Sequence, residues 1–171
     1  MTFAFKELIR HKPAGVVLSE MEISESSPLN KLAALAAATS GYETAAITLY
    51  EGDTKICVGS YNCSAKSWKR SGLDRAMTKD VHFIADFDKQ FPKSPMANGQ
   101  LGSFVSAAVA RIKLQDEIVG GLWIYSVKPT PSLPDNVTET LKEIASLAGA
   151  FIYTKAELKL TLANVFSLAN R

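Results

Sequence analysis

Residues 117–152 read EIVGGLWIYSVKPTPSLPDNVTETLKEIASLAGAFI and contain the change from strand to helix that decides the fold. The first ten residues are rich in β-branched and aromatic side chains, which are typical of a strand. The segment KPTPSLPDN then ends the strand. Ser132 and Asp135 are spaced as in a helix capping box, and Pro134 lies where a first helical turn tolerates proline. The stretch therefore predicts a sheet strand followed directly by a helix.

The predicted helix continues to the end of the chain. Its apolar residues follow a four-three alternation: Val137, Leu141, Ile144, Ala148 and Phe151, then Leu158, Leu162, Val165 and Ala169. About 35 helical residues at about 1.5 Å each span about 50 Å, whereas a domain of this length has a radius of gyration of about 15 Å. We expect one end to overhang and to form a homodimer through residues near 137–169. The alternative is a monomer in which the chain bends near residues 153–154 and folds back.

Two hairpins precede this helix. Residues 103–127 turn at Gln115-Asp116-Glu117, and both arms are apolar enough to predict a sheet covered on both faces. Residues 44–50 and 55–62 flank a turn that contains Gly52 and Asp53.

The remaining segments are shorter. A helix is predicted from Ser27-Pro28 to Ser40-Gly41, because proline suits its start and glycine its left-handed end. Residues 64–77 are interpreted as a loop with a short helix carrying Trp68 and Leu73. Residues 81–87 are interpreted as a strand and 88–102 as a loop.

This order predicts an α+β fold with a central antiparallel β-sheet of five or six strands. The helices at 28–40 and 134–153 are expected together on one face, and the loop-helix segments on the other. We divide the chain into an N-terminal extension (1–27), a domain (28–153) and a C-terminal helix extension (154–171).

Composition narrows the class of protein. The 171 residues are 47% hydrophobic and carry a net charge of +2, which gives no sign of a surface for nucleic acid or membrane. No run of 18 apolar residues and no leader pattern is present, so we predict a cytoplasmic protein. Cys57 and Cys63 are about 20 Å apart along an extended strand, too far for a disulfide.

The motifs IADFDKQF (84–91) and the closing block from residue 117 resemble the GAF domain family of sensory modules, over about residues 28–153. The resemblance implies a GAF-like sheet whose pocket is walled by segments 64–77 and 88–102. Bilin-binding members attach their chromophore through a cysteine after the third strand, but residues 64–127 contain none. Cys57 and Cys63 also do not reproduce the cysteine pattern of free methionine sulfoxide reductases of this fold.

Asp86 and Asp88 allow three interpretations. An aspartate at a strand end commonly accepts backbone N–H bonds and holds a turn, and we favour this structural role. A pocket-facing Asp86 that binds a donor group of a ligand is the rival. A catalytic pair is the weakest interpretation, because no nucleophile or orienting group lies nearby in the sequence. His82 is expected to be a surface or turn residue rather than a metal ligand.

We therefore predict a non-catalytic sensor that binds a small molecule and signals through its terminal helices, with a separate signalling partner. The sequence names no cofactor, metal site or catalytic residue. The alternatives are a thiol-dependent reductase on the same frame and a ligand-free dimerisation or interaction module. The expected ligand contacts are Trp68, Asp86, Phe91, Met96, Phe104, Ser106 and Trp123.

Overall fold

The computed structural model describes residues 27–72, 74, 78–92 and 103–169. Residues 1–26 of the predicted N-terminal extension, Leu73 and most of the 88–102 loop lie outside these residues. Within them, no helix is both long enough and apolar enough to cross a membrane.

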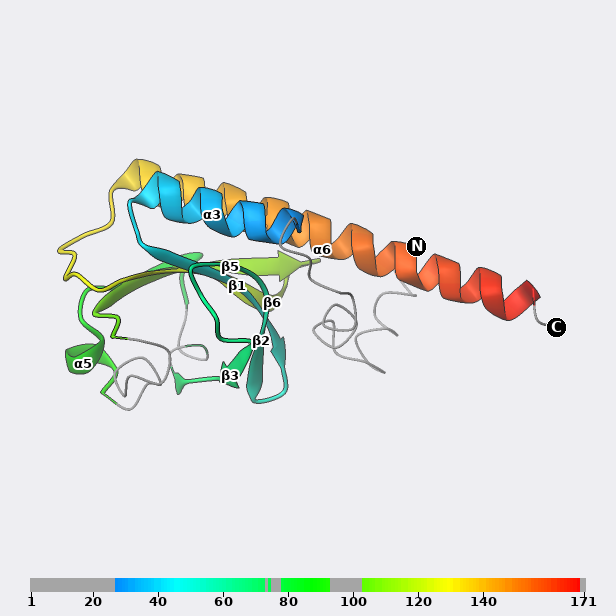
Figure 1. The fold of residues 1–171 in the computed structure, drawn as a ribbon, viewed down its shortest axis with the longest axis horizontal. Coiled ribbons are helices and arrows are strands. Elements are labelled where there is room, and N and C mark those ends of the chain that lie inside the picture. The colour runs from blue at the N-terminus through cyan, green and yellow to red at the C-terminus, as the bar shows by residue number, and fades with distance from the viewer. Residues whose placement is uncertain (1–26, 73, 75–77, 93–102, 170–171) are drawn as a thin grey trace.

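Six strands form one sheet in the order β3-β2-β1-β6-β5-β4. Every pair of neighbours is antiparallel, which confirms the predicted α+β class. The pairing of β1 with β6 joins the two predicted hairpins into one sheet (Figure 1). The strands are β1 (Thr44–Glu51), β2 (Thr54–Tyr61), β3 (Ser67–Lys69), β4 (Val81–Ile84), β5 (Ser106–Leu114) and β6 (Glu117–Ser126).

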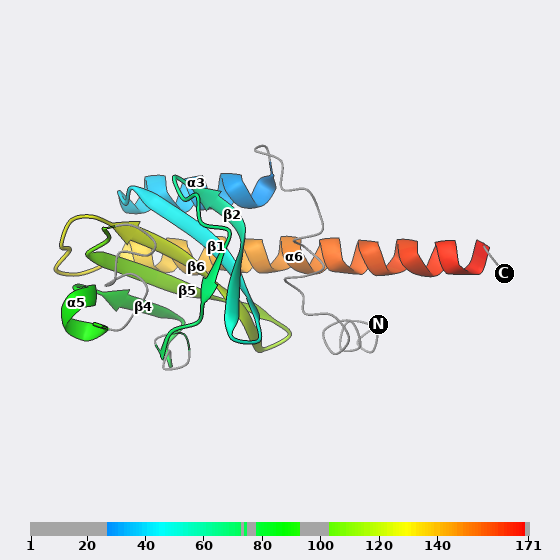
Figure 2. The ribbon, with the colours of Figure 1, turned by 60° about the horizontal axis from the view of Figure 1, so that its bottom comes forward.

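Two helices, α3 (Pro28–Ser40) and α6 (Asp135–Ala169), lie side by side on one face of the sheet, as predicted (Figures 1 and 2). Proline occupies the first turn of α3, and Gly41 ends the helix in the left-handed conformation with φ of 72°. The sequence located both ends of this helix correctly.

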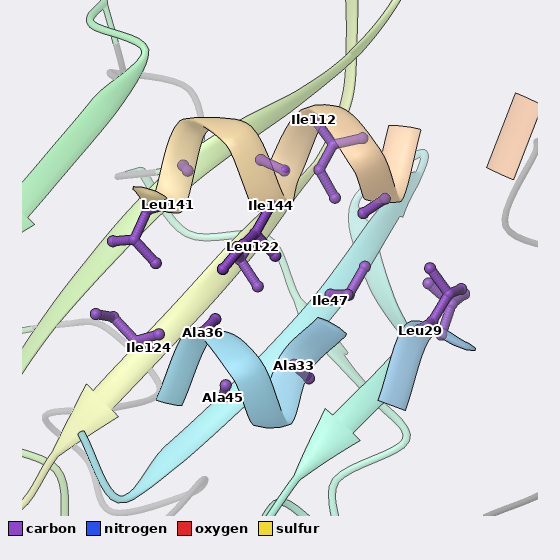
Figure 3. Close-up of a cluster of buried hydrophobic side chains, with 14 of the residues drawn as sticks. Leu29, Ala33, Ala36, Ala45, Ile47, Ile112, Leu122, Ile124, Leu141 and Ile144 are labelled. Atoms are coloured by element: carbon purple, nitrogen blue, oxygen red, sulfur yellow. The ribbon is translucent and has the colours of Figure 1, made fainter. Parts of the chain in front are cut away.

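The layer between these helices and the sheet is the larger of two apolar cores. Alanines on the inner face of α3 let it lie close to the strands, and leucines and isoleucines fill the space under α6 (Figure 3). Its members include Leu29, Ala33, Ala36, Ala45, Ile47, Ile112, Leu122, Ile124, Leu141 and Ile144.

Helix α6 runs for 35 residues without interruption and extends far past the sheet (Figures 1 and 2). The bend considered near residues 153–154 is not present. The first part of the predicted seam, from Val137 to Ala148, is buried against the sheet of its own domain. It is therefore not available to a second chain, and a dimer contact must use other positions of α6.

Two predictions of local structure were wrong. Trp68 lies in the edge strand β3 rather than on a short helix, because backbone pairing with β2 places it opposite Lys55. The strand that begins at Val81 ends at Ile84, because Phe87 already starts the short helix α5 (Phe87–Gln90). The second hairpin turns as expected, with positive φ at both Gln115 and Asp116.

His82 holds the turn before β4, in agreement with its predicted role. Its Nε2 accepts hydrogen bonds from the backbone N–H groups of Thr78 (2.9 Å) and Lys79 (3.0 Å). Burial, followed by the charges of Arg111 and Lys79, lowers the pKa of His82 from its ordinary value of 6.5. The folded chain thus favours the neutral imidazole, the only form that can accept these bonds.

We expect this histidine to make stability fall in mild acid. Because the pKa of His82 is lower in the folded than in the unfolded chain, its contribution is fully present above about pH 6.5 and is lost as pH falls through the folded pKa. Urea unfolding of the wild type and of His82→Gln at pH 7.5 and pH 5 measures this, since the difference between the two proteins removes all other titrating groups. An equal loss of stability in both proteins would contradict the assignment.

Candidate functional site

The face of the sheet opposite the helices carries an aromatic layer, which we define as Trp68, Phe87, Phe91, Phe104, Trp123 and Tyr125. Trp123 and Tyr125 are two positions apart in β6, so their side chains point to the same face of the sheet. Their rings stack with centroids 5.8 Å apart, and Phe104 stacks on Tyr125 at 5.1 Å. The layer draws residues from β3, α5, β6 and the segment before β5.

A buried ion pair lies against this layer. Lys55 Nζ is 2.9 Å from Asp74 Oδ1, and the two side chains are 4% and 0% exposed. Asp74 Oδ2 accepts hydrogen bonds from the backbone N–H (2.7 Å) and the hydroxyl (3.0 Å) of Ser71. The carboxylate thus ties the chain that follows β3 to a lysine in the sheet.

The ammonium group of Lys55 also faces two indole rings. Its Nζ lies 4.3 Å from the ring centroid of Trp123 and 5.6 Å from that of Trp68. Burial lowers the pKa of Lys55 from its ordinary value, and the carboxylate of Asp74 opposes this effect. The pair is the only acid–base contact among the described residues in which both side chains are buried.

A second cation lies at the edge of this site. The guanidinium of Arg70 sits 4.0 Å from the ring centroid of Tyr50, and the hydroxyl of Tyr50 is 3.4 Å from Asp74 Oδ1. Burial, and next the charge of Asp74, raise the pKa of Tyr50 well above its ordinary value. Tyr50 therefore stays a neutral hydrogen-bond donor beside the carboxylate.

Three buried polar groups of the aromatic layer have no hydrogen-bond partner in the described structure. They are Nε1 of Trp68, Nε1 of Trp123 and the hydroxyl of Tyr125. Trp123 and Tyr125 are each 1% exposed, and Trp68 is 9% exposed. Buried donors are ordinarily satisfied by protein, water or ligand, so this layer offers polar contacts that the described residues do not use.

The structure brings four of the predicted ligand contacts together: Trp68, Phe91, Phe104 and Trp123 all belong to the aromatic layer. Ser106 is buried, but its hydroxyl donates to the carbonyl of Lys128 (2.7 Å), so it holds the turn after β6. Met96 lies outside the described residues.

Asp86 caps helix α5, the structural role that we favoured. Its Oδ1 accepts a hydrogen bond from the backbone N–H of Lys89 (3.2 Å), and this bond is the main reason that the pKa of Asp86 is lowered. Asp88 is exposed on the first turn of α5. The two carboxylates thus lie at a helix start, and the ligand contact of Asp86 stays a prediction.

Sequence reasoning missed the polar half of the site. Lys55 carried one indication, since it alternates with Cys57 along a predicted strand and so shares its inward face. Asp74 carried none, because it meets Lys55 only after β3 has paired with β2.

The two cysteines are free and pack at the border of the aromatic layer. Burial raises the pKa of the Cys57 thiol to about 12, and its Sγ donates to the carbonyl of Gly59 at 3.3 Å. A thiol held protonated in this way is a poor nucleophile. Among the described residues, no three His, Cys, Asp or Glu side chains gather as metal ligands.

Solved structures share this architecture. No protein-family model and no curated protein matches the chain. The PixJ GAF-domain of Thermosynechococcus elongatus, in its blue-light absorbing form, superposes with a TM-score of 0.65 over 94% of this chain and 96% of that chain, at 10% identity. The chromophore-binding domain of a bacteriophytochrome from R. palustris gives 0.61 over 90% and 63%, at 13% identity.

An enzyme is also among the similar structures. The type II free methionine-R-sulfoxide reductase from Thermoplasma acidophilum gives a TM-score of 0.57 over 82% of this chain and 96% of that chain, at 16% identity. The sheet order, the paired helices on one face and these superpositions agree with the predicted architecture. The chain therefore has the fold of a GAF domain.

Proposed function

We propose that this chain is a non-catalytic sensory module that binds a small molecule against the aromatic layer, between the sheet and segments 64–77 and 88–102. The observation that carries the proposal is the set of buried N–H and O–H groups on Trp68, Trp123 and Tyr125, which have no partner among the residues that the structure describes. An apolar site with a few convergent polar groups suits a small organic ligand. The proposed contacts remain Trp68, Asp86, Phe91, Met96, Phe104, Ser106 and Trp123.

Native mass spectrometry of protein purified from its source tests the proposal directly, because a bound molecule adds its mass to that of the chain. A thermal-shift screen of cyclic nucleotides, tetrapyrroles and metabolites covers several chemical classes of ligand at once, because any molecule that binds the folded chain raises its melting temperature. For any ligand found, Trp68→Ala should weaken binding more than it lowers stability. If no ligand is retained and none raises the melting temperature, the module is an interaction domain with a filled pocket.

We propose that the output passes through α6 in a homodimer, to a separate signalling partner. Past the sheet, α6 exposes leucines instead of burying them: Leu158 is 53% and Leu162 is 48% exposed. Leu147, which is 57% exposed, lies on the same side of the helix as these two leucines. This stripe flanks the buried part of α6, so a ligand that shifts the sheet can shift the dimer contact.

Light scattering is expected to give twice the mass of one chain at micromolar concentration, and the double substitution Leu147→Glu, Leu158→Glu should give monomers, because buried like charges would face each other. The control is Ser146→Glu with Ala150→Glu, two exposed positions of α6 outside this stripe. A monomeric wild type, or a dimer that survives the leucine substitutions, would reject this contact.

A thiol-dependent reductase is the second candidate, supported by the reductase that shares the fold and by the position of Cys57 and Cys63 beside the aromatic layer. The raised pKa of Cys57 argues against it. The rate of iodoacetamide alkylation against pH decides between the two, since the reductase requires a thiolate near neutral pH.

A further inference from the structure

A small pocket opens at the edge of the sheet, where β4 begins. β4 is the edge strand, and it pairs with β5 only as far as Ala110 (Figure 2). Past that point no described strand covers this side of β5, which continues to Leu114. The pocket has a volume of about 210 Å³. We call it the edge pocket, and its lining residues are Asp80, Arg111, Lys113, Lys142 and Ser146.

Two close contacts fix the walls of the edge pocket. The backbone N–H of Arg111 donates to the carbonyl of Asp80 (2.9 Å), which holds this acid beside β5. Helix α6 also packs tightly on β5, because a Cβ atom added to Gly149 would lie 3.1 Å from the carbonyl oxygen of Lys113. The lining residues of β5 and α6 are therefore held at a fixed separation.

The edge pocket has an excess of positive charge. Its lining contains three cations and one carboxylate, which leaves a net charge of +2. Glu139, which lies outside the lining, pairs with Lys142 at 2.7 Å and reduces this excess to +1. The pKa of Asp80 is held below its ordinary value, first by the hydrogen bond from Lys113 and further by the charges of all three cations. The same field attracts an anion from solution.

Arg111 is the cation with the most unused binding capacity. Its Nε is buried and has no hydrogen-bond partner among the described residues, and none of the ion pairs found among them includes Arg111. A guanidinium stays charged at neutral pH, and its planar N–H donors match the oxygens of a phosphate or carboxylate group. An anion in the edge pocket would supply acceptors that Arg111 does not find in the described part of the chain.

The two lysines can change partner at little cost. Lys113 Nζ lies 2.6 Å from Asp80 Oδ1, and Lys142 Nζ lies 2.7 Å from Glu139 Oε1. All four side chains are at least 39% exposed, and exposed ion pairs contribute little to stability. The carboxylate of Asp80 competes with a bound anion, because it holds Lys113 and repels negative charge.

We propose that the edge pocket binds the phosphate group of a small phosphomonoester, held by Arg111, Lys113, Lys142 and the hydroxyl of Ser146. Such a group carries about −1.5 to −2 charges near neutral pH, which suits the excess positive charge better than the single charge of a carboxylate. The volume is below the roughly 300–1,000 Å³ of pockets that enclose a whole drug-sized ligand, so the rest of the molecule would lie at the surface. This site goes beyond the proposed sensory function, because it shares no residue with the aromatic layer.

Three probes with similar skeletons test the charge class: glycerol 3-phosphate, glycerate and glycerol. Titrations followed by ¹H–¹⁵N spectra of the full chain are run at constant ionic strength, because salt screens exposed charges. Glycerol 3-phosphate should saturably shift the backbone signals of the lining residues. Glycerate should bind at least about tenfold more weakly, because it offers fewer charges and fewer acceptor oxygens, and glycerol should not bind.

Substitutions in the lining assign the contacts. Arg111→Gln and Lys142→Gln should each weaken the binding of glycerol 3-phosphate by about tenfold or more, the usual effect of losing one charge-assisted hydrogen bond. Asp80→Asn should strengthen it, because this change removes the competing carboxylate and releases Lys113. The matched control is Lys128→Gln, which removes the same charge from an exposed residue outside the edge pocket and should leave the affinity unchanged.

Lys142→Gln keeps the test decisive if Arg111→Gln does not fold, because the side chain of Lys142 is 39% exposed. Glycerate that binds as tightly as glycerol 3-phosphate, weaker binding by Asp80→Asn, or equal effects of Lys128→Gln and Lys142→Gln would overturn the proposal. Vesicles that contain phosphatidic acid distinguish the source of the phosphate. Sedimentation of the chain with them, without any shift by glycerol 3-phosphate, would overturn the small molecule in favour of a lipid headgroup. A negative result here leaves the sensory proposal standing, since that proposal is tested at other residues.

Discussion

Replacing Asp74 by alanine is expected to lower the free energy of unfolding by about 3–5 kcal/mol, the usual cost of leaving one partner of a buried ion pair without compensation. The side chain of Lys55 is 4% exposed in the pair, so the substitution leaves its ammonium buried without a counter-charge. The same substitution releases the N–H and hydroxyl of Ser71 from their acceptor. Urea unfolding at pH 7 measures the change.

Two comparisons test the cause. Asp80→Ala breaks an exposed ion pair, in which the side chain of Asp80 is 57% and that of Lys113 45% exposed, and should cost less than about 1 kcal/mol. The double variant Lys55→Met, Asp74→Leu removes both buried charges and should recover most of the stability lost in Asp74→Ala. An Asp74→Ala protein as stable as Asp80→Ala would show that Lys55 is not held by this pair.

Gly120→Ala is expected to cost at least about 3 kcal/mol, the upper part of the range for overpacking, or to prevent folding. A Cβ atom on Gly120 would lie 1.9 Å from the carbonyl oxygen of Thr48 and 3.1 Å from Cα of Leu49. These are backbone atoms of β1, which cannot rotate away as a side chain can. Relief requires β1 and β6 to separate, and this pairing joins the two halves of the sheet.

Two other glycines give a graded control. Gly121→Ala meets side-chain atoms, Cγ2 of Val109 at 2.9 Å and Nε1 of Trp123 at 3.0 Å, and should cost less because those groups can shift. Gly72→Ala meets nothing within 4 Å and should be nearly neutral. Chemical unfolding of the three variants is expected to rank them in this order, and a Gly120→Ala protein as stable as Gly72→Ala would disprove the close approach of the strands.

The local parts of the fold were predictable because short-range chemistry specifies them. Proline and glycine mark the ends of α3, and the apolar spacing of α6 follows from 3.6 residues per turn. The turn at Gln115-Asp116 and the cap at Asp86 likewise depend on residues within a few positions of each other. The prediction that Trp68 lies on a short helix was wrong, because β3 is only three residues long and forms through its pairing with β2.

The sequence alone determined the antiparallel α+β class, the overhanging helix and most of the aromatic residues of the site, since burial of apolar side chains follows their spacing. Tertiary structure decided the site's polar chemistry. Lys55 and Asp74 are 19 residues apart, and only the strand pairing of β2 with β3 brings them to 2.9 Å. That the polar groups of Trp68, Trp123 and Tyr125 have no partner within the described part of the chain is likewise a property of the packed layer, because a hydrogen bond depends on where both groups lie in space.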